Sequence, residues 1–255
     1  MFRHPASLLA ALTLAACASH PPPPPANACA CPRPDGHGHG HGHGHGHGHG
    51  HGHHAPPGPA GHHHRFDDPA RWSAVFDAPE RDAWQQPDAV IRHLALAPDA
   101  RVADLGAGTG YFSVRLARAV PQGRVFAADV ESSMVQHLGE RARREGITNL
   151  TPVQATPASA QLPEPVDVIL VVDTHHHIDD RPNYYRALQR SLRPGGRVVI
   201  VDFTLESPMG PPREARLTPA QVDAEMTAAG YARQGEALML PNQYVLSFVV
   251  AQPVR

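Results

Sequence analysis

A short acidic and glycine-rich segment is the first part of this 255-residue chain whose residue types and spacing suggest chemistry. It reads Asp104-Leu-Gly106-Ala-Gly108-Thr-Gly110. Glycines allow the backbone to approach a ligand without a Cβ in the way. Asp129 follows nineteen residues after Gly110, and an acid at that distance can accept hydrogen bonds from both hydroxyls of a ribose. The pattern therefore predicts a nucleotide-type ligand.

Two features of the same turn limit which nucleotide-type ligand it can bind. A dinucleotide fingerprint needs its third glycine one position later, where this chain has Tyr111. An acid that opens the loop, Asp104, has no use beside a pyrophosphate, but it suits the ammonium group of a sulfonium amino acid. The remaining alternative is a glycine turn in some other α/β fold.

The elements that must position these residues alternate along the chain. Apolar runs of strand length alternate with segments of helical periodicity, which favours a doubly wound, mainly parallel sheet of the α/β class. We predict seven strands, the last two forming an antiparallel hairpin: Arg101–Leu105, Arg124–Ala128, Leu150–Gln154, Val166–Val172, Arg197–Val201, Gly235–Leu240 and Gln243–Ala251. The predicted helices are Tyr111–Val120, Ser133–Arg144, Asn183–Leu192 and a helix that Thr218 caps and that ends at Ala229.

Three segments together resemble class I S-adenosylmethionine-dependent methyltransferases. Val102-Ala-Asp-Leu-Gly-Ala-Gly-Thr-Gly-Tyr-Phe-Ser113 is similar to the first motif of that family. Ala127-Ala-Asp-Val-Glu131 with Met134 is similar to the second, and Leu192-Arg-Pro-Gly-Gly-Arg-Val-Val-Ile-Val-Asp202 to the segment before and along the fifth strand. The likeness runs from about Ala89 to the C-terminus and is nearest to the small-molecule branch with the quinone-biosynthesis and arsenite methyltransferases.

The resemblance implies roles for the turn. Asp104, Gly106, Gly108 and Gly110 would line the methionine part of S-adenosylmethionine, and Asp129 would hold its ribose. One departure concerns the adenine, because an Asp commonly follows the third strand in the family and this chain reads Gln154-Ala-Thr-Pro157. Arsenite methyltransferases bind their substrate through cysteines. All three Cys of this chain precede residue 66, so that activity is excluded.

The loop after the fourth predicted strand faces the donor methyl group in the family, and here it reads Asp173-Thr-His175-His176-His177. A base is needed only if the acceptor carries a proton, and imidazole suits that role near neutral pH. The predicted catalytic residues are His176, His177 and Asp173. The alternatives are a structural role for one or more of these histidines and a metal trio, although three consecutive side chains cannot all converge from one short loop.

Four aromatic residues, Trp72, Phe76, Trp84 and Tyr111, are candidates for a lid over this site. Core packing is an equally good explanation for them, because aromatic side chains dominate cores as well as binding sites.

A histidine tract precedes the globular part. Thirteen of the 20 His lie between His37 and His64 and alternate with Gly for much of that span, after the proline run Pro21–Pro25. Such a segment cannot bury enough apolar area to fold, so residues 18–65 are predicted to be a disordered, Pro-rich and His/Gly-rich linker. Imidazoles at this density chelate Zn, Ni or Cu ions at low affinity. The predicted ligands are His37, His39, His41, His43, His45, His47, His49, His51 and His53.

The first seventeen residues predict export. The apolar run Ser7–Ala16 is too short to cross a membrane, and Leu14-Ala15-Ala16-Cys17 resembles the lipobox of bacterial lipoproteins. Residues 1–17 would then be a lipoprotein-type signal peptide, with Cys17 lipid-anchored to a membrane of the cell envelope. The alternatives are plain secretion after cleavage at an A-x-A-like site, and a cytoplasmic protein if the signal is not used.

Composition excludes several mechanisms for the domain of residues 66–255. Every one of the 22 basic residues is Arg, so Schiff-base and lysine-base chemistry are ruled out. No basic run stands out and the formal net charge is −2, so nucleic acid is not an expected partner.

Two functions follow from these observations. One is S-adenosylmethionine-dependent methyl transfer to an unidentified small or medium-sized acceptor molecule. The other is an exported, membrane-tethered metal-binding module with an inactive methyltransferase fold. The sequence leaves the oligomeric state open.

Overall fold

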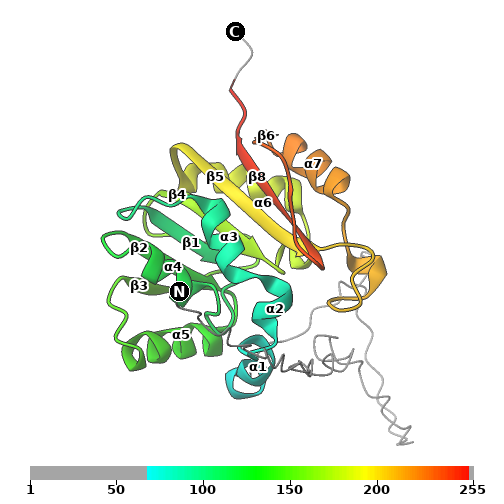
Figure 1. Cartoon of the computed structure of the whole chain (residues 1–255). Helices are drawn as coiled ribbons and strands as arrows, with labels where there is room; N and C mark the ends of the chain where they lie inside the picture. Colours follow the sequence, from blue (N-terminus) through cyan, green and yellow to red (C-terminus); the bar gives the residue numbers. More distant parts are fainter. Residues whose placement is uncertain (1–67, 253–255) are drawn as a thin grey trace, which may run out of the picture.

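The computed structural model describes residues 68–252 (Figure 1). The predicted signal peptide, the lipidation site Cys17, the linker and the nine predicted metal ligands from His37 to His53 lie outside the described residues. Among the described residues, no helix has the length and apolar character needed to cross a membrane.

Seven α-helices are described, and local capping explains where some of them begin. The Asp68 side chain accepts a hydrogen bond from the Arg71 amide at 3.1 Å and caps α1. The predicted cap at Thr218 is confirmed, because Thr218 and Gln221 form a reciprocal capping box. The helices are α1 (Pro69–Phe76), α2 (Arg81–Gln85), α3 (Pro87–Leu94), α4 (Ser113–Ala119), α5 (Ser132–Arg144), α6 (Arg181–Leu188) and α7 (Pro219–Ala228), with 3₁₀ turns η1 (His175–His177), η2 (Gln189–Ser191) and η3 (Arg213–Ala215).

The strands form one sheet in the order β3-β2-β1-β4-β5-β8-β6, with β7 paired to β8. β1 to β5 run parallel, whereas β8 is antiparallel to β5, β6 and β7. The predicted α/β fold with a mainly parallel sheet and antiparallel C-terminal strands is confirmed. The strands are β1 (Arg101–Leu105), β2 (Arg124–Asp129), β3 (Leu150–Gln154), β4 (Val166–Val172), β5 (Leu192–Phe203), β6 (Tyr231–Arg233), β7 (Leu238–Met239) and β8 (Gln243–Val250).

The strand count differs from the seven predicted. β6 is the additional strand, and the predicted Gly235–Leu240 strand is reduced to β7. Tyr231 is buried and pairs with Val250, so β6 covers the sheet edge that the prediction left to the hairpin. β5 also begins five residues before the predicted Arg197, since its register on β4 shifts across the Pro194-Gly-Gly segment.

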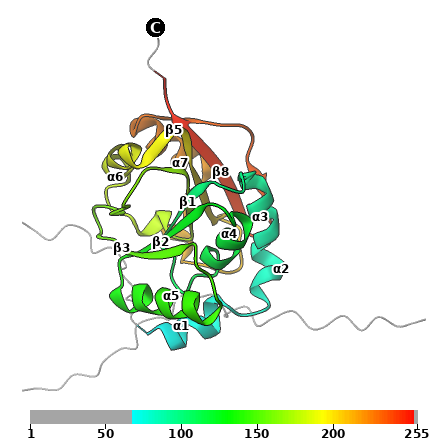
Figure 2. The ribbon, with the colours of Figure 1, turned by 90° about the vertical axis from the view of Figure 1, so that its left-hand side faces the viewer.

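Two apolar clusters lie on opposite faces of the sheet, which is the doubly wound arrangement. One contains Leu94, Leu116 and Leu138 from α3, α4 and α5. The other contains Leu188 of α6 and Met226 of α7. Figure 2 shows α6 and α7 on one side of the strands and α3 and α4 on the other. β4 lies in the middle and is buried on both faces, as its continuous apolar run predicts.

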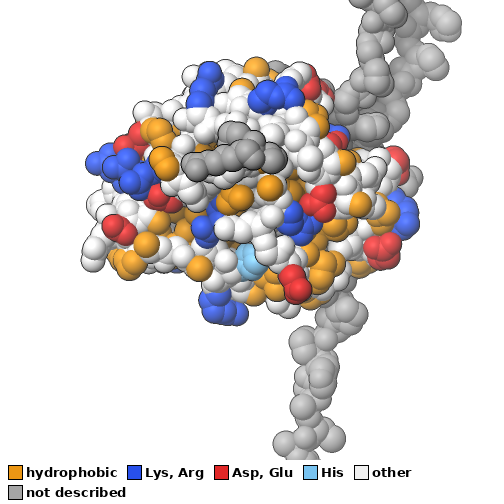
Figure 3. Space-filling model, turned by 90° about the horizontal axis from the view of Figure 1, so that it is seen from above, with side chains coloured by type: hydrophobic (Ala, Val, Ile, Leu, Met, Phe, Trp, Pro, Cys, Tyr) orange, Lys and Arg blue, Asp and Glu red, His pale blue; other side chains and the backbone are white. Residues whose placement is uncertain are grey.

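The order of the strands reverses at β1, because β2 lies on one side of it and β4 on the other. Loops leaving β1 and β4 therefore diverge, and a crevice opens at the carboxyl ends of these strands. On the face of the molecule seen in Figure 3, acidic and basic side chains are interspersed among apolar ones, without a basic stripe.

Candidate functional site

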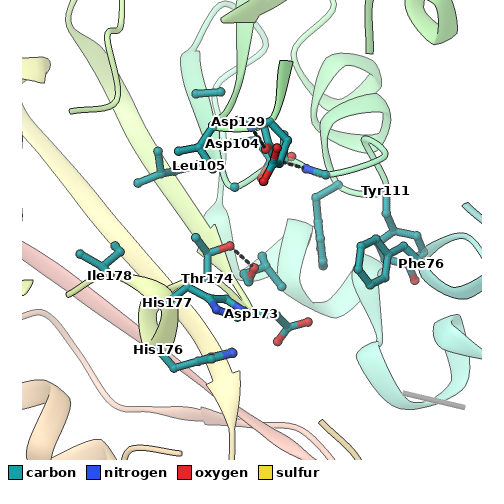
Figure 4. Close-up of a pocket in the computed structure, with 18 of the residues that line it drawn as sticks. Phe76, Asp104, Leu105, Tyr111, Asp129, Asp173, Thr174, His176, His177 and Ile178 are labelled. Atoms are coloured by element: carbon teal, nitrogen blue, oxygen red, sulfur yellow. Dashed lines mark hydrogen bonds between the residues drawn. The ribbon is translucent and has the colours of Figure 1, made fainter. Parts of the chain in front are cut away.

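A cavity of about 450 Å³ occupies the crevice at the carboxyl ends of β1 and β4. This volume lies within the range of small-molecule sites. Figure 4 shows that residues from the β1 loop, the end of β2, the η1 turn and α1 point into one space. Its wall contains the three predicted catalytic residues, Asp173, His176 and His177, and four of the five predicted cofactor residues, Asp104, Gly106, Gly108 and Asp129. The fifth, Gly110, is not a lining residue.

The glycines of the β1 loop are required by its geometry. Gly106, Gly108 and Gly110 have φ of 74°, 53° and 91°, a region that side chains with a Cβ avoid. A Cβ on Gly106 would overlap the Thr174 side chain, and one on Gly110 would come within 2.8 Å of Leu138. The Gly106 amide donates to the Ala128 carbonyl at 2.8 Å, which ties the loop to β2. Gly110 thus packs the loop against α5, whereas Gly106 admits the close approach of Thr174.

Asp129 ends β2 and closes the other side of the loop. Its Oδ2 accepts the Gly108 amide at 2.8 Å and its Oδ1 accepts the Glu131 amide at 2.9 Å (Figure 4). Burial raises the pKa of this carboxyl, and the backbone hydrogen bonds act in the opposite direction. Each carboxylate oxygen has two lone pairs, so both can still accept a ligand hydroxyl.

Asp104 lies at the end of β1 and is buried beside Asp129. The Ser113 hydroxyl donates to its Oδ2 at 2.5 Å. Burial raises the Asp104 pKa to about 6, and the neighbouring Asp129 carboxyl adds to that rise. A cation bound here would lower the Asp104 pKa again, because it would favour the ionised carboxylate.

The adenine side of the predicted site has mostly apolar walls. Val130, Ala155 and Pro157 line the cavity next to Asp129. The Gln154 amide group donates to the Val130 carbonyl at 2.9 Å, so this side chain braces the backbone of the neighbouring loop. Thr156, between Ala155 and Pro157, is a polar residue in this part of the cavity wall.

Asp173 follows β4 and has φ of 52°, an uncommon conformation for a residue other than glycine. Its Oδ1 accepts a hydrogen bond from the Gln243 side-chain amide, and its Oδ2 lies 3.5 Å from Nη2 of Arg81. Burial raises the Asp173 pKa to about 7, although Arg81 acts to lower it. The predicted catalytic Asp173 therefore lies in the cavity wall as part of a network that includes α2 and β8.

The three consecutive histidines separate. His175 is fully buried on the far side of η1, where Nδ1 lies 2.8 Å from the Tyr185 hydroxyl and Nε2 lies 3.1 Å from Glu225. His176 and His177 line the cavity with their ring centroids 4.2 Å apart. His176 and His177 thus lie in the cavity wall, whereas His175 does not. Within the described residues no cluster of three or more His, Cys, Asp or Glu is arranged to hold a metal ion.

The four aromatic lid candidates all line the cavity. Trp72 and Phe76 of α1 stack with their centroids 5.1 Å apart. The Tyr111 ring lies between two guanidinium groups, with Cζ of Arg81 and Arg115 at 4.1 and 4.0 Å from its centroid. Such cation–π contacts hold α2 against the β1 loop. The Arg81 guanidinium also donates to the Phe76 carbonyl at 2.8 Å, and it joins α1 to α2, the two helices that carry three of the lid candidates.

Sequence reasoning missed Arg81, Gln243 and the role of Asp202. Asp202 lies near the end of β5 with 1% of its surface exposed, and both of its carboxylate oxygens lie 3.0 Å from Nδ1 of His176. A signal for it existed, because an acid at the carboxyl end of a strand beside the switch point is placed to face a ligand site. No comparable signal marks Arg81 or Gln243, which reach the site from distant elements.

Comparison with known proteins gives an independent view of the same region. Residues 102–196 match the family model of a methyltransferase domain. The chain is 36% identical over 107 residues to the ubiquinone/menaquinone biosynthesis C-methyltransferase UbiE of Edwardsiella ictaluri, a match that covers 41% of this chain and 43% of the relative. The corresponding protein of Vibrio campbellii is 34% identical over 110 residues, with 42% of each chain covered. The chain thus matches less than half the length of these curated relatives.

Solved structures agree in fold. A SAM-dependent methyltransferase from Aquifex aeolicus superimposes with a TM-score of 0.66 at 24% identity, over 72% of this chain and 99% of that protein. Magnesium protoporphyrin IX methyltransferase from Synechocystis, solved with bound SAM, gives a TM-score of 0.52 at 20% identity over 66% of this chain and 79% of that protein. The chain therefore shares its fold with solved class I methyltransferases, and residues 102–196 are similar to a methyltransferase domain.

Proposed function

We propose that the protein is an S-adenosylmethionine-dependent methyltransferase that acts on a small or medium-sized acceptor molecule. The observation that carries this proposal is the pair of buried carboxyl groups, Asp104 and Asp129, on either side of a glycine turn in one cavity. The match of residues 102–196 to a methyltransferase domain supports it.

The residues present fit S-adenosylmethionine. Asp104 is a buried acid whose pKa is raised by its surroundings, and a ligand ammonium group would offset that cost. Asp129 offers two carboxylate oxygens to vicinal ribose hydroxyls. A Cβ at Gly108 would project toward Phe76 at 3.7 Å, into the space between the loop and the lid. A pyrophosphate would instead meet two buried acids, so a dinucleotide fits poorly.

The chain's own residues would hold and orient the reactants. Asp104 would bind the ammonium group, Asp129 the ribose, and the apolar surfaces of Val130 and Pro157 the adenine. When bound, S-adenosylmethionine supplies a methyl group on a positively charged sulfur. Methyl transfer is an in-line displacement in which positioning contributes much of the rate, so a cavity that holds both reactants in line is the main requirement.

The acceptor side of the cavity favours a flat apolar molecule. Trp72, Phe76, Trp84 and Phe203 line it, and they offer ring faces on which an aromatic acceptor can stack. The relatives from Edwardsiella ictaluri and Vibrio campbellii are named for ubiquinone and menaquinone biosynthesis, and an aromatic or quinone-like acceptor is in keeping with this wall.

Transfer of label tests the proposed function. The full chain is incubated with S-adenosylmethionine labelled in the methyl group and a small-molecule extract of the source cells. We expect label in organic-soluble products with the wild type and a loss of at least tenfold with Asp129→Asn. Asp99→Asn is the matched control, because Asp99 is exposed and precedes the amino end of β1, whereas the cavity lies at the carboxyl end. Label that stays entirely in the cofactor for every variant would contradict methyl transfer.

We also propose the N-terminal arrangement that the sequence predicts: a signal peptide ending at Cys17, a tether through residue 65 and a domain held at a bacterial membrane of the cell envelope. Incorporation of labelled fatty acid into the wild type but not into Cys17→Ser supports it. An intact Met1 on an unlabelled cytoplasmic protein contradicts it. Deletion of residues 36–64 should abolish most Ni or Zn binding and leave the melting temperature of the domain unchanged.

A further inference from the structure

His176 differs from its two neighbours in how it joins the cavity to a buried acid. It lies on η1, directly after β4, and its imidazole lines the cavity. Only 5% of its side chain is exposed, and Nδ1 lies 3.0 Å from both carboxylate oxygens of Asp202. Asp202 is itself fixed at the end of β5, where its Oδ1 also accepts the Phe203 amide at 2.8 Å.

This contact decides which ring nitrogen of His176 is available for chemistry. A carboxylate can only accept, so Nδ1 must carry the proton that it donates to Asp202. In the neutral ring Nε2 is then a lone-pair acceptor. The imidazole tip lies on the side of the Asp173 carboxyl in the cavity (Figure 4). Asp202 thus fixes both the tautomer and the orientation of a base that faces the proposed acceptor space.

Several charged and titratable groups surround His176. Asp202 from β5 and Asp173 from the end of β4 raise its pKa, whereas burial and Arg181 of α6 lower it, and the net direction is upward. The ring centroid of His177 lies 4.2 Å from that of His176, and His175 acts to lower the pKa of Asp202. Burial raises the pKa of Asp202, but His176, His175 and the hydrogen bond from the Phe203 amide together outweigh it, and the net direction is downward. The pair is therefore arranged to hold a proton on the imidazole.

We propose that His176 is the proton acceptor for a phenol- or enol-type hydroxyl group of the methyl acceptor, and that Asp202 is its positioning residue. The inference rests on the proposed methyl transfer and adds the acceptor class to it. The flat aromatic wall supports a conjugated acceptor, and a base with a fixed lone pair is useful only if the nucleophile carries a proton.

The step balances with the groups present. The acceptor O–H bond breaks, its proton forms a bond to Nε2 of His176, and the electron pair stays on oxygen. That oxygen forms the new bond to the methyl carbon as the carbon–sulfur bond breaks, and the electron pair of that bond stays on sulfur to give a neutral thioether. The imidazolium remains paired with the Asp202 carboxylate, so no new unpaired charge is left in the buried site.

His175 and His177 are less suited to this role. Both ring nitrogens of His175 contact Tyr185 and Glu225, and its ring is fully buried away from the cavity. His177 lines the cavity and its ring is tilted against that of His176, but the carboxylate of Asp202 contacts His176. We expect His177→Gln to change acceptor affinity more than proton transfer.

The pH dependence of cofactor binding tests whether His176 lies near the donor methyl group, and the test needs no methyl acceptor. S-adenosylmethionine and S-adenosylhomocysteine differ by a methyl group and one positive charge, so the sulfonium disfavours an imidazolium close to it. For the full chain we expect the affinity ratio of the two compounds, measured by calorimetry, to rise at least about threefold from about pH 6 to about pH 8. The ratio should be flat in His176→Gln.

Three further variants separate His176 from its surroundings. Asp173→Asn removes another titrating group that acts on His176. The rise of the affinity ratio with pH should remain in this variant. Asp202→Asn should move the rise to lower pH, and the same shift should appear in the His176 ring signal by nuclear magnetic resonance, which is identified by its loss in His176→Gln. His137→Gln on α5, which lies outside the cavity wall, is the matched control and should behave as the wild type.

The acceptor class is tested with para-nitrophenol, whose phenolate absorbs in the visible. Bound to the full chain with S-adenosylhomocysteine, it should be ionised at a pH below its pKa in solution, and His176→Gln should abolish this effect. Its methyl ether, para-nitroanisole, is the matched ligand without the proton and should bind at least tenfold more weakly. Equal binding of the two ligands, or a flat affinity ratio in the wild type with tight cofactor binding, would overturn the inference and leave the proposed function standing. Absence of any cofactor binding would instead overturn the proposed function.

Discussion

The two halves of the cavity are built by different means. The half proposed for the cofactor, called the cofactor half below, is made by contiguous chain: Asp104 and the glycine turn lie within seven residues, and Asp129 ends the next strand. The acceptor half is made by side chains that meet from distant elements. Arg81 contacts Asp173 across 92 residues, and Gln243 contacts Asp173 across 70. Backbone geometry fixes the first half, whereas an ion-pair and hydrogen-bond network fixes the second.

If the proposed function holds, the same fold can retain one half of the cavity while the other half changes. The glycine conformations and the strand order leave few alternatives for the turn. The lid helices α1 and α2 are held by individual side-chain contacts, which substitution can replace without altering the sheet. We expect substitutions in the cofactor half to affect folding and cofactor binding together, and those in the acceptor half to affect titration and lid closure.

The largest effect should follow from adding one methyl group to the cofactor turn. Gly106 and Gly146 both have positive φ, but a Cβ on Gly106 would overlap Thr174 and one on Gly146 would meet open space. Gly146→Ala should cost only the conformational penalty of about 1 kcal/mol. Gly106→Ala should lower the free energy of unfolding by roughly 2 kcal/mol more, measured by urea denaturation. Equal losses in the two variants would show that the close approach of Thr174 is not a constraint.

The second effect should be greater in cofactor binding than in folding. Asp129→Asn keeps one oxygen acceptor for the Gly108 amide, but it turns an NH2 group toward the Glu131 amide and loses the charge toward the ribose. We expect the dissociation constant for S-adenosylmethionine to rise at least tenfold, or about 1.4 kcal/mol, the scale of a lost charge-assisted hydrogen bond. The exposed control Asp99→Asn should leave it unchanged. Tight binding by Asp129→Asn would move the ribose away from the end of β2.

The third effect concerns pH and belongs to the acceptor half. The pKa of Asp173 is raised to about 7 by burial, so its protonated form favours the folded state, and that contribution is lost as the pH rises through about 7. Asp104, with a pKa of about 6, acts in the same direction. The free energy of unfolding should therefore fall between pH 5 and 8 by on the order of 1–2 kcal/mol after allowance for solvent screening.

Asp173→Asn should reduce this slope, because the amide does not titrate. Chemical denaturation at a series of pH values measures it, with Asp99→Asn as the control. An unchanged slope in Asp173→Asn would contradict this assignment, since Asp173 would then not be the carboxyl that titrates near neutral pH.

The smallest effect should be local loosening of the lid. Arg81→Lys keeps the positive charge but loses the planar group that donates to Phe76 and stacks on Tyr111. We expect amide hydrogen exchange in residues 69–85 to accelerate by roughly threefold, about 0.6 kcal/mol of local opening, while the sheet is unaffected. Arg92→Lys, on the exposed face of α3, is the control. Unchanged exchange in Arg81→Lys would mean that packing of Trp72 and Phe76 alone closes the lid.

Prediction from sequence succeeded where the signal was local. Alternating apolar runs and helical periodicity were enough for the mainly parallel sheet, and the Thr218-Pro219 pair was enough for the start of α7. β6 was missed because three residues carry too short a pattern, and its pairing with β8 depends on the burial of Tyr231. The sequence also made His176 and His177 equal candidates for the catalytic base, because the side chains that each contacts cannot be identified from their positions in the loop.

The roles of Asp202 and Arg81 show the same limit. Asp202 was visible in the sequence as the last residue of a motif, but its contact with His176 requires β4 and β5 to be adjacent and in register. Arg81 lies in a segment whose composition gives no sign of a long-range contact. Its ion pair with Asp173 follows only from the way α2 packs over the carboxyl ends of the strands.

Calorimetric titration of the full chain with S-adenosylmethionine tests whether the cavity is a cofactor site. The buried carboxyl groups of Asp104 and Asp129 and the glycine turn between them predict one site of micromolar affinity, about −8 kcal/mol, that S-adenosylhomocysteine shares and NAD does not. Asp129→Asn should weaken it and Asp99→Asn should not. A wild-type protein that gives no heat with S-adenosylmethionine at about millimolar concentration, or that binds NAD in its place, would contradict the account.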